Sequence, residues 1–172
     1  MKAIEVVADG FGRIQEAVHE TVEGLSPEEL HARIDRGANS IAWLVWHLYR
    51  IQDDHMADAG GLEQVWHAGG WADRFGLPFA ADDTGYGHTA REVAAVRVES
   101  GDLLLGYADA VHEQTLAFVR SLAATDLERI VDERWDPPVS LGVRLVSVLA
   151  DDLQHAGQAA FVRGVLHRRR AG

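Results

Sequence analysis

The last third of the chain holds a carboxylate and an imidazole at a spacing suited to binding a metal ion. Asp151 and His155 are four residues apart in the segment DDLQH. On a helix, residues four apart project from one face and lie about one turn apart along the axis. Both side chains could therefore bind one ion, as other helical i, i+4 pairs do. Such pairs also arise by chance on helix surfaces, and that alternative stays open at this point.

A third candidate ligand lies in an apolar segment far away in the sequence. His47 occurs within WLVWHL, and a buried histidine is ordinarily a hydrogen-bonded core residue. If it faced Asp151 and His155 across a helical bundle, it would complete a set of two histidines and one carboxylate. Three protein ligands leave positions open for water or substrate, as in catalytic sites. His55 lies about 12 Å further along the same helix, too far to share the ion.

The elements that would position these residues are helices. Apolar residues recurring every three or four positions predict four long helices. These helices cover residues 3–23, 40–58, 102–122 and 140–166. Short capped helices begin at Ser26, Thr89 and Thr125, the second of them ending near residue 100. Strand signals are nearly absent, so we predict an all-α four-helix bundle, a single domain over residues 1–172.

The last helix should bury the stripe that carries its apolar residues. The predicted inner face consists of Val143, Val146, Leu149, Leu153, Ala156, Ala160, Phe161 and Val165. Because Asp151 and His155 follow this stripe, we expect them to point toward the bundle interior or its edge. A carboxylate in that position is costly unless a cation or hydrogen-bond donors meet it.

A long segment rich in glycine and aromatic residues separates the second and third long helices. It covers residues 62–88, and loops of this length are often functional. We expect it to form one wall of a pocket, with Arg74, Tyr86 and His88 as candidate substrate-binding residues. An arginine there could hold a carboxylate through two hydrogen bonds. Alternatively, the segment only covers one end of the core.

Composition excludes several classes of function. The chain has 27 acidic and 16 basic residues, a formal net charge of −11, and no cysteine. Such a charge disfavours binding to nucleic acid and to anionic membranes. The absence of cysteine excludes disulfides and thiolate ligands. No apolar run approaches the roughly 20 residues of a membrane span, and the start lacks a signal-peptide core, so we expect a cytoplasmic protein.

Three segments resemble the DinB superfamily, and more narrowly its actinobacterial branch related to mycothiol-dependent maleylpyruvate isomerase. They are NSIAWLVWHL at 39–48, DDLQHAGQ at 151–158 and the lead-in SPEEL at 26–30. The resemblance implies an up-down-down-up bundle with a divalent metal, often zinc or nickel. The family's ligands map onto His47, Asp151 and His155, where aspartate replaces the histidine or glutamate of other members.

The resemblance also implies an activity. Family members with assigned activities are mainly metal-dependent transferases or isomerases that use a low-molecular-weight thiol. Lys2 is the only lysine, which suits a GC-rich actinobacterial genome and hence mycothiol as cosubstrate. The partner would be a small electrophilic molecule, and a homodimer is compatible with the apolar surfaces. The alternatives are a non-catalytic metal- or ligand-binding bundle, and a scaffold in which His47 and Asp151 satisfy each other.

Overall fold

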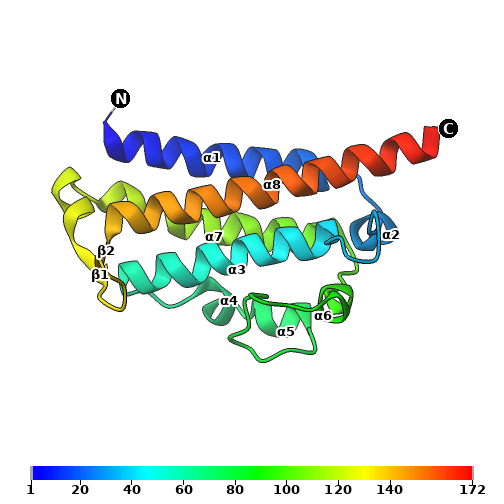
Figure 1. The fold of residues 1–172 in the computed structure, drawn as a ribbon, viewed down its shortest axis with the longest axis horizontal. Helices are drawn as coiled ribbons and strands as arrows, with labels where there is room; N and C mark the ends of the chain where they lie inside the picture. Colours follow the sequence, from blue (N-terminus) through cyan, green and yellow to red (C-terminus); the bar gives the residue numbers. More distant parts are fainter. Residues whose placement is uncertain (1, 172) are drawn as a thin grey trace.

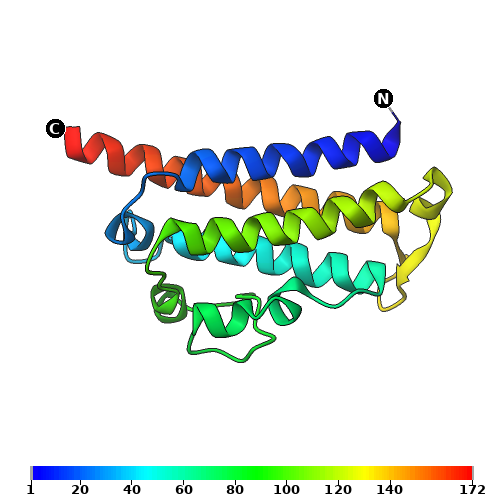
Figure 2. The same cartoon turned by 180° about the vertical axis from the view of Figure 1, so that it is seen from behind.

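Four long helices lie side by side in the computed structural model, which describes residues 2–171 (Figure 1). They are α1 (Ala3–Val22), α3 (Ile41–Gly60), α7 (Gly101–Ser121) and α8 (Leu141–Ala171). α1 and α8 run in one direction, and α3 and α7 run in the opposite one, as the reverse view also shows (Figure 2). The predicted all-α bundle is therefore confirmed, with up-down-down-up topology.

The helix α3 forms the centre of the structure. Ser40 caps it by accepting a hydrogen bond from the backbone N–H of Trp43, and Gly61 ends it in a left-handed conformation. Every residue from Ile41 to Arg50 is buried. This burial on all sides arises because α7 and α8 flank the helix and the segment that follows it folds back over its open face.

Short helices connect the long ones. α2 (Pro27–His31) and α6 (Ala90–Ala95) begin with the predicted capping boxes, whereas α4 (Val65–Ala68) and α5 (Trp71–Phe75) interrupt the predicted loop. α6 also ends earlier than expected. The chain beyond it is extended, and Val98 donates its backbone N–H to Nε2 of His31 at 2.8 Å.

A β-hairpin precedes α8 and was not anticipated from the sequence. A 3₁₀-helix, η1 (Ala124–Glu128), replaces the predicted short helix, and β1 (Ile130–Asp132) then pairs antiparallel with β2 (Val139–Ser140). The side chain of Asp132 connects the hairpin to α8. It accepts hydrogen bonds from Nη2 of Arg134 at 2.8 Å and from Nη2 of Arg144 at 3.0 Å.

The buried face of α8 differs from the predicted one. Val143, Val146, Leu153 and Phe161 are more than half exposed. The buried positions are Leu141, Arg144, Leu145, Val148, Asp152, Ala156, Ala159 and Val162. The inner face includes two charged residues, so hydropathy alone placed it on the wrong side. Within residues 2–171, no helix is both long and apolar enough to cross a bilayer.

A pair of leucine variants tests this assignment of the α8 faces. Leu145 is fully buried and Leu153 is 53% exposed. We expect Leu145→Ala to lower the free energy of unfolding by about 2–5 kcal/mol, because it leaves a cavity. Leu153→Ala should change it by less than about 0.5 kcal/mol. Urea unfolding of both variants measures the difference, and equal losses would contradict the observed orientation.

The ion pairs of Asp132 predict a pH dependence of stability. Arg134 and, secondarily, Arg144 hold the pKa of Asp132 well below its usual range. Their stabilising effect is fully present above the unfolded pKa of about 3.9 and is lost as the pH falls through the folded value. We expect Asp132→Asn to unfold at a lower temperature than wild type at pH 7. The gap should narrow only below about pH 4, and a gap that is constant down to pH 2.5 would contradict the pairing.

Candidate metal centre

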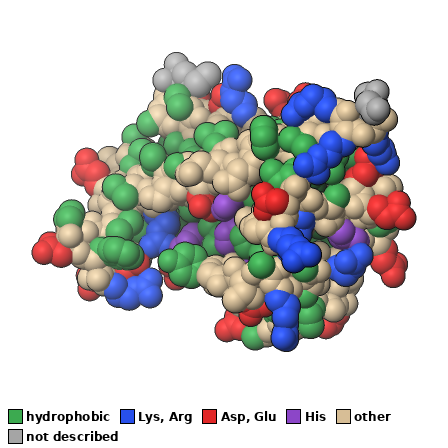
Figure 3. All heavy atoms as spheres, turned by 45° about the vertical axis from the view of Figure 1, so that its right-hand side comes forward, with side chains coloured by type: hydrophobic (Ala, Val, Ile, Leu, Met, Phe, Trp, Pro, Cys, Tyr) green, Lys and Arg blue, Asp and Glu red, His purple; other side chains and the backbone are tan. Residues whose placement is uncertain are grey.

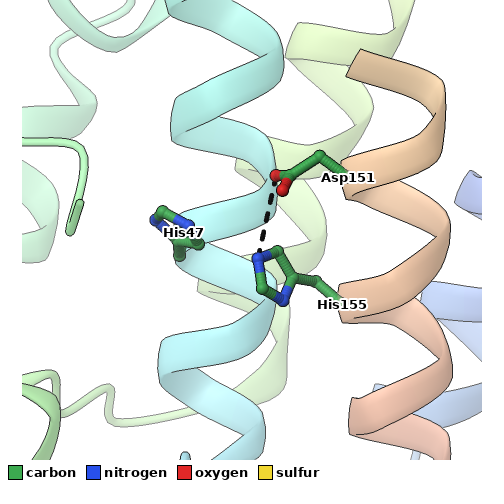
Figure 4. A group of neighbouring side chains, drawn as sticks. All are labelled: His47, Asp151 and His155. Carbon is green, nitrogen blue, oxygen red and sulfur yellow. Dashed lines mark ion pairs between the residues drawn. The ribbon is translucent and has the colours of Figure 1, made fainter. Parts of the chain in front are cut away.

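The antiparallel packing of α3 and α8 brings the three proposed ligands together. Figure 4 shows His47 on α3, with Asp151 and His155 reaching toward that helix from α8. One potential ligand atom from each residue lies within 4.8 Å of the other two. Nε2 of His155 is 3.7 Å from Oδ2 of Asp151, and the two imidazole centroids are 4.9 Å apart. The sequence grouped these residues correctly in space, and their role as ligands stays a prediction.

Hydrogen bonds orient both imidazoles. Nδ1 of His47 donates to the carbonyl of Thr84, and Nδ1 of His155 lies 3.2 Å from the side-chain oxygen of Gln158. A neutral imidazole that donates through Nδ1 keeps the lone pair of Nε2 for a metal. Burial lowers the pKa of His47, and the neighbouring His155 acts in the same direction. Both effects favour the neutral form of His47, which ligation requires.

The carboxylate supplies the strongest sign that a cation belongs here. Oδ2 of Asp151 is buried and has no hydrogen-bond partner among the described residues. A buried carboxylate oxygen without a partner is costly, and a divalent cation would satisfy it. The scaffold alternative would need a bond between Asp151 and His47, but the imidazole N–H of His47 is directed at Thr84 instead. Two imidazoles and one carboxylate suit zinc, nickel and related divalent ions.

The neighbouring Asp152 has a different environment. Its side chain is fully buried in the core, and burial raises its pKa well above the usual range, with the charge of Asp151 adding to the effect. The side chains of these two adjacent aspartates therefore lie in different environments. Asp151 faces the candidate site, and Asp152 points into the bundle.

Aromatic packing holds the imidazole of His47 in place. Trp43 stacks on His47 with 4.5 Å between the ring centroids and an angle of 17°. Nε1 of Trp43 donates to Nδ1 of His88 at 3.1 Å, and Nε2 of His88 lies 3.1 Å from Oδ1 of Asp83. His88 was expected to bind substrate. The structure places it behind Trp43, where it fixes the ring that packs against His47.

The bond to Thr84 depends on a glycine. Gly85 has a φ of +87°, and a Cβ there would lie 2.8 Å from Trp46 and 3.0 Å from Nδ1 of His47. Its backbone N–H donates to Oδ1 of Asp83 at 2.6 Å. Sequence reasoning recognised residues 84–88 as a turn but missed this support, because a backbone carbonyl leaves no signature in side-chain patterns.

A cavity of about 420 Å³ opens beside the candidate site. His47 and Asp151 lie at one end, and Tyr86 stands at the rim with 90% of its surface exposed. The space-filling view shows histidine side chains exposed in a recessed part of the surface (Figure 3). Arg74 is absent from the residues lining the cavity, since its guanidinium lies over the ring of Trp71 at 3.7 Å. Of the three expected substrate-binding residues, only Tyr86 lines this cavity.

A larger cavity lies elsewhere in the molecule. Its volume is about 910 Å³, and it lies between α1 and the end of α7. It includes none of the three candidate ligands. The candidate ligands His47 and Asp151 line the smaller cavity instead.

Comparison with known proteins agrees with this geometry. The model of the DinB superfamily matches residues 11–159. The chain belongs to the DinB superfamily. This DinB protein is also similar to a crystal structure of a conserved protein from Enterococcus faecalis, at 28% identity and a TM-score of 0.88. That similarity covers 95% of this chain and 96% of the other. No curated protein matches the chain.

The DinB superfamily is typically metal-binding. Whether His47, Asp151 and His155 bind a metal ion can be tested by changing Gly85, which supports the bond from His47 to Thr84. We expect Gly85→Ala to weaken zinc binding by about tenfold or more, because it displaces the Thr84 carbonyl from His47. Isothermal titration of the metal-free protein with Zn²⁺ measures the effect.

Gly87→Ala is the matched control. Gly87 also has a positive φ, of +75°, but a Cβ there would meet nothing within 4 Å. Both variants carry backbone strain of about 1–2 kcal/mol, so both should lose stability. Only the first should lose zinc affinity, and an equal affinity in the two variants would show that Thr84 does not orient a ligand.

Proposed function

We propose that this protein is a divalent-metal-dependent enzyme that uses a low-molecular-weight thiol, mycothiol, in a transfer to, or an isomerisation of, a small electrophilic molecule. The observation that carries the proposal is the buried Oδ2 of Asp151, which has no hydrogen-bond partner among the described residues. It lies 3.7 Å from Nε2 of His155, and His47 completes the group. One side of this group faces a cavity large enough for a small molecule. Three protein ligands and an open side are the arrangement of catalytic sites.

The chemistry would come from the ion, and the protein would supply its position. A divalent ion bound here would lower the pKa of a thiol or a water molecule and hold it as a nucleophile. His47 and His155 would each present Nε2, and Asp151 would balance part of the charge. The Trp43 ring covers one face of His47 and limits access of water from that side. Substrate would approach from the side of the cavity.

Two features of the sequence support mycothiol as the thiol. The segments at 39–48 and 151–158 resemble the branch related to mycothiol-dependent maleylpyruvate isomerase. The single lysine among many arginines suits a GC-rich genome of the kind found in actinobacteria. We place this activity in the cytoplasm. Proteins of that reducing compartment seldom contain disulfides, and this chain has no cysteine to form one. Zinc and nickel both fit the donor set.

Metal analysis and thiol-dependent turnover test the proposal together. We expect about one equivalent of zinc or nickel after exhaustive dialysis, and its loss in His155→Ala, because a site with three protein ligands depends on each of them. His47→Ala should lose thiol-dependent turnover by about 100-fold or more while the helical circular dichroism is retained. His67→Ala, which removes an exposed histidine of α4 that does not line the cavity, should keep both properties.

Each failure has a separate meaning. Protein that takes up no metal on titration would show that the three side chains form a structural cluster. Protein that binds metal but shows no turnover with mycothiol and a panel of electrophiles would be the non-catalytic binding protein. An unchanged rate in His47→Ala would rule out the metal mechanism.

A further inference from the structure

The cavity has a second polar end, two helical turns away from the candidate metal ligands. Arg144 precedes Asp151 by seven residues on α8, about 10 Å along the axis. His55 follows His47 by eight residues on α3, so the antiparallel helices bring Arg144 and His55 together. Nη1 of Arg144 donates to Nδ1 of His55 at 2.6 Å. Both residues line the same cavity as His47 and Asp151.

This end of the cavity carries two guanidinium groups. Asp132 accepts hydrogen bonds from both Arg144 and Arg134, so two guanidinium groups share one carboxylate. Arg144 is only 8% exposed, and its described bonds to His55 and Asp132 use two of the five N–H donors that a guanidinium carries. A buried cation whose partner is shared favours a further anion.

Two other acidic groups lie near this end but are not among the residues that line the cavity. Asp54 and Asp58 line a separate depression, which His55, Arg134 and Arg144 also line. Oδ2 of Asp54 is 3.9 Å from Nδ1 of His55. Asp54 already accepts a hydrogen bond from Gln64 at 2.8 Å. The carboxylates lining the cavity are Asp132 and Asp151, and a divalent ion at the other end would neutralise Asp151. The cavity would then carry a net positive charge.

The remaining walls suit an apolar linker between two polar groups. Ile51 of α3 and Val148 of α8 lie between the two ends, and both line the cavity. Trp135, which follows β1, also lines it, with 66% of its surface exposed. These side chains offer apolar and aromatic contact and no additional charge.

We propose that Arg144, assisted by Arg134 and His55, forms an anion subsite that binds the carboxylate of a small substrate. The reactive end of that substrate would lie at His47, Asp151 and His155, about 10 Å away. The assignment of the reactive end rests on the proposed function, whereas the subsite itself rests on the arginines and the cavity. The substrate class is thus an electrophilic molecule with a carboxylate separated from its reactive group by a short apolar chain.

Binding of a dicarboxylate and its monoamide tests the subsite without turnover. With zinc-loaded protein, isothermal titration should show suberate binding about tenfold or more tightly than suberic acid monoamide, because the amide loses a charge-assisted hydrogen bond. In Arg144→Met this preference should fall to about twofold, the statistical factor for a ligand with two equivalent ends. Arg91→Met, which removes an exposed arginine of α6, should keep the full preference.

Arg134→Met keeps the proposal testable if Arg144→Met fails to fold. The Arg134 side chain is 83% exposed, so its removal is tolerable for the fold, and the preference should fall severalfold. Equal affinities for the two ligands in wild type would overturn the subsite, as would a preference that survives in both variants.

Metal content measured on the same samples separates this test from that of the proposed function. If the protein binds no zinc, the proposed function fails, and the subsite is then tested in the metal-free protein with octanoate and octanamide. A preference for octanoate that Arg144→Met or Arg134→Met abolishes would support the anion subsite alone. Equal binding of octanoate and octanamide would overturn it.

Discussion

A single buried guanidinium connects the central helix to the segment that supports the candidate site. Arg50 on α3 is fully buried; its Nε donates to the carbonyl of Asp83, and its Nη1 donates to Gln64. Nη1 also lies 3.6 Å from Asp53, which accepts the backbone N–H groups of Val65 and Trp66. The chain from residue 62 to 88 is thereby attached to α3 through charged groups inside the protein. A buried charge is stable only with such partners, so the interaction also fixes the path of the segment.

The position of the imidazole follows from that attachment. Arg50 holds the backbone at Asp83, the Asp83 side chain holds Gly85 and His88, and the intervening Thr84 presents its carbonyl to His47. The segment therefore does more than cover the core. It sets which nitrogen of His47 is free, and through His88 it fixes the tryptophan that stacks on the ring. A side chain on a rigid helix is oriented here by backbone from a less regular part of the chain.

Local signals in the sequence predicted the long helices and the grouping of His47, Asp151 and His155 in space. The helix caps at Ser26, Ser40 and Thr89 involve groups no more than three residues apart in the sequence. The histidine in WLVWHL is conspicuous because its neighbours are apolar. The i, i+4 spacing of Asp151 and His155 needs only helix geometry. These features depend on short-range physics, which a single sequence carries.

The features that were missed depend on contacts between distant residues. The face that α8 buries includes Arg144, which bonds to Asp132 and His55, and hydropathy does not predict a buried arginine. The hairpin is three residues against two, too short to show alternation. Arg74 was assigned to the cavity from its loop alone, and its stacking on Trp71 could not be foreseen. The positions of Arg144 and Arg74 thus depend on polar and aromatic contacts with residues that the local sequence does not reveal.

The two ends of the cavity belong to different kinds of structure, and this division bears on how the protein could diversify. His47, Asp151 and His155 come from long helices whose packing also stabilises the fold. Changes there are limited both by the geometry of the site and by the stability of the bundle. Arg134 and Trp135 come from a short hairpin with mostly exposed residues, where substitutions cost little stability. Relatives could exchange the hairpin and accept other molecules while inheriting the same reactive centre. Ligand choice and chemistry would then evolve at separate rates within one small bundle.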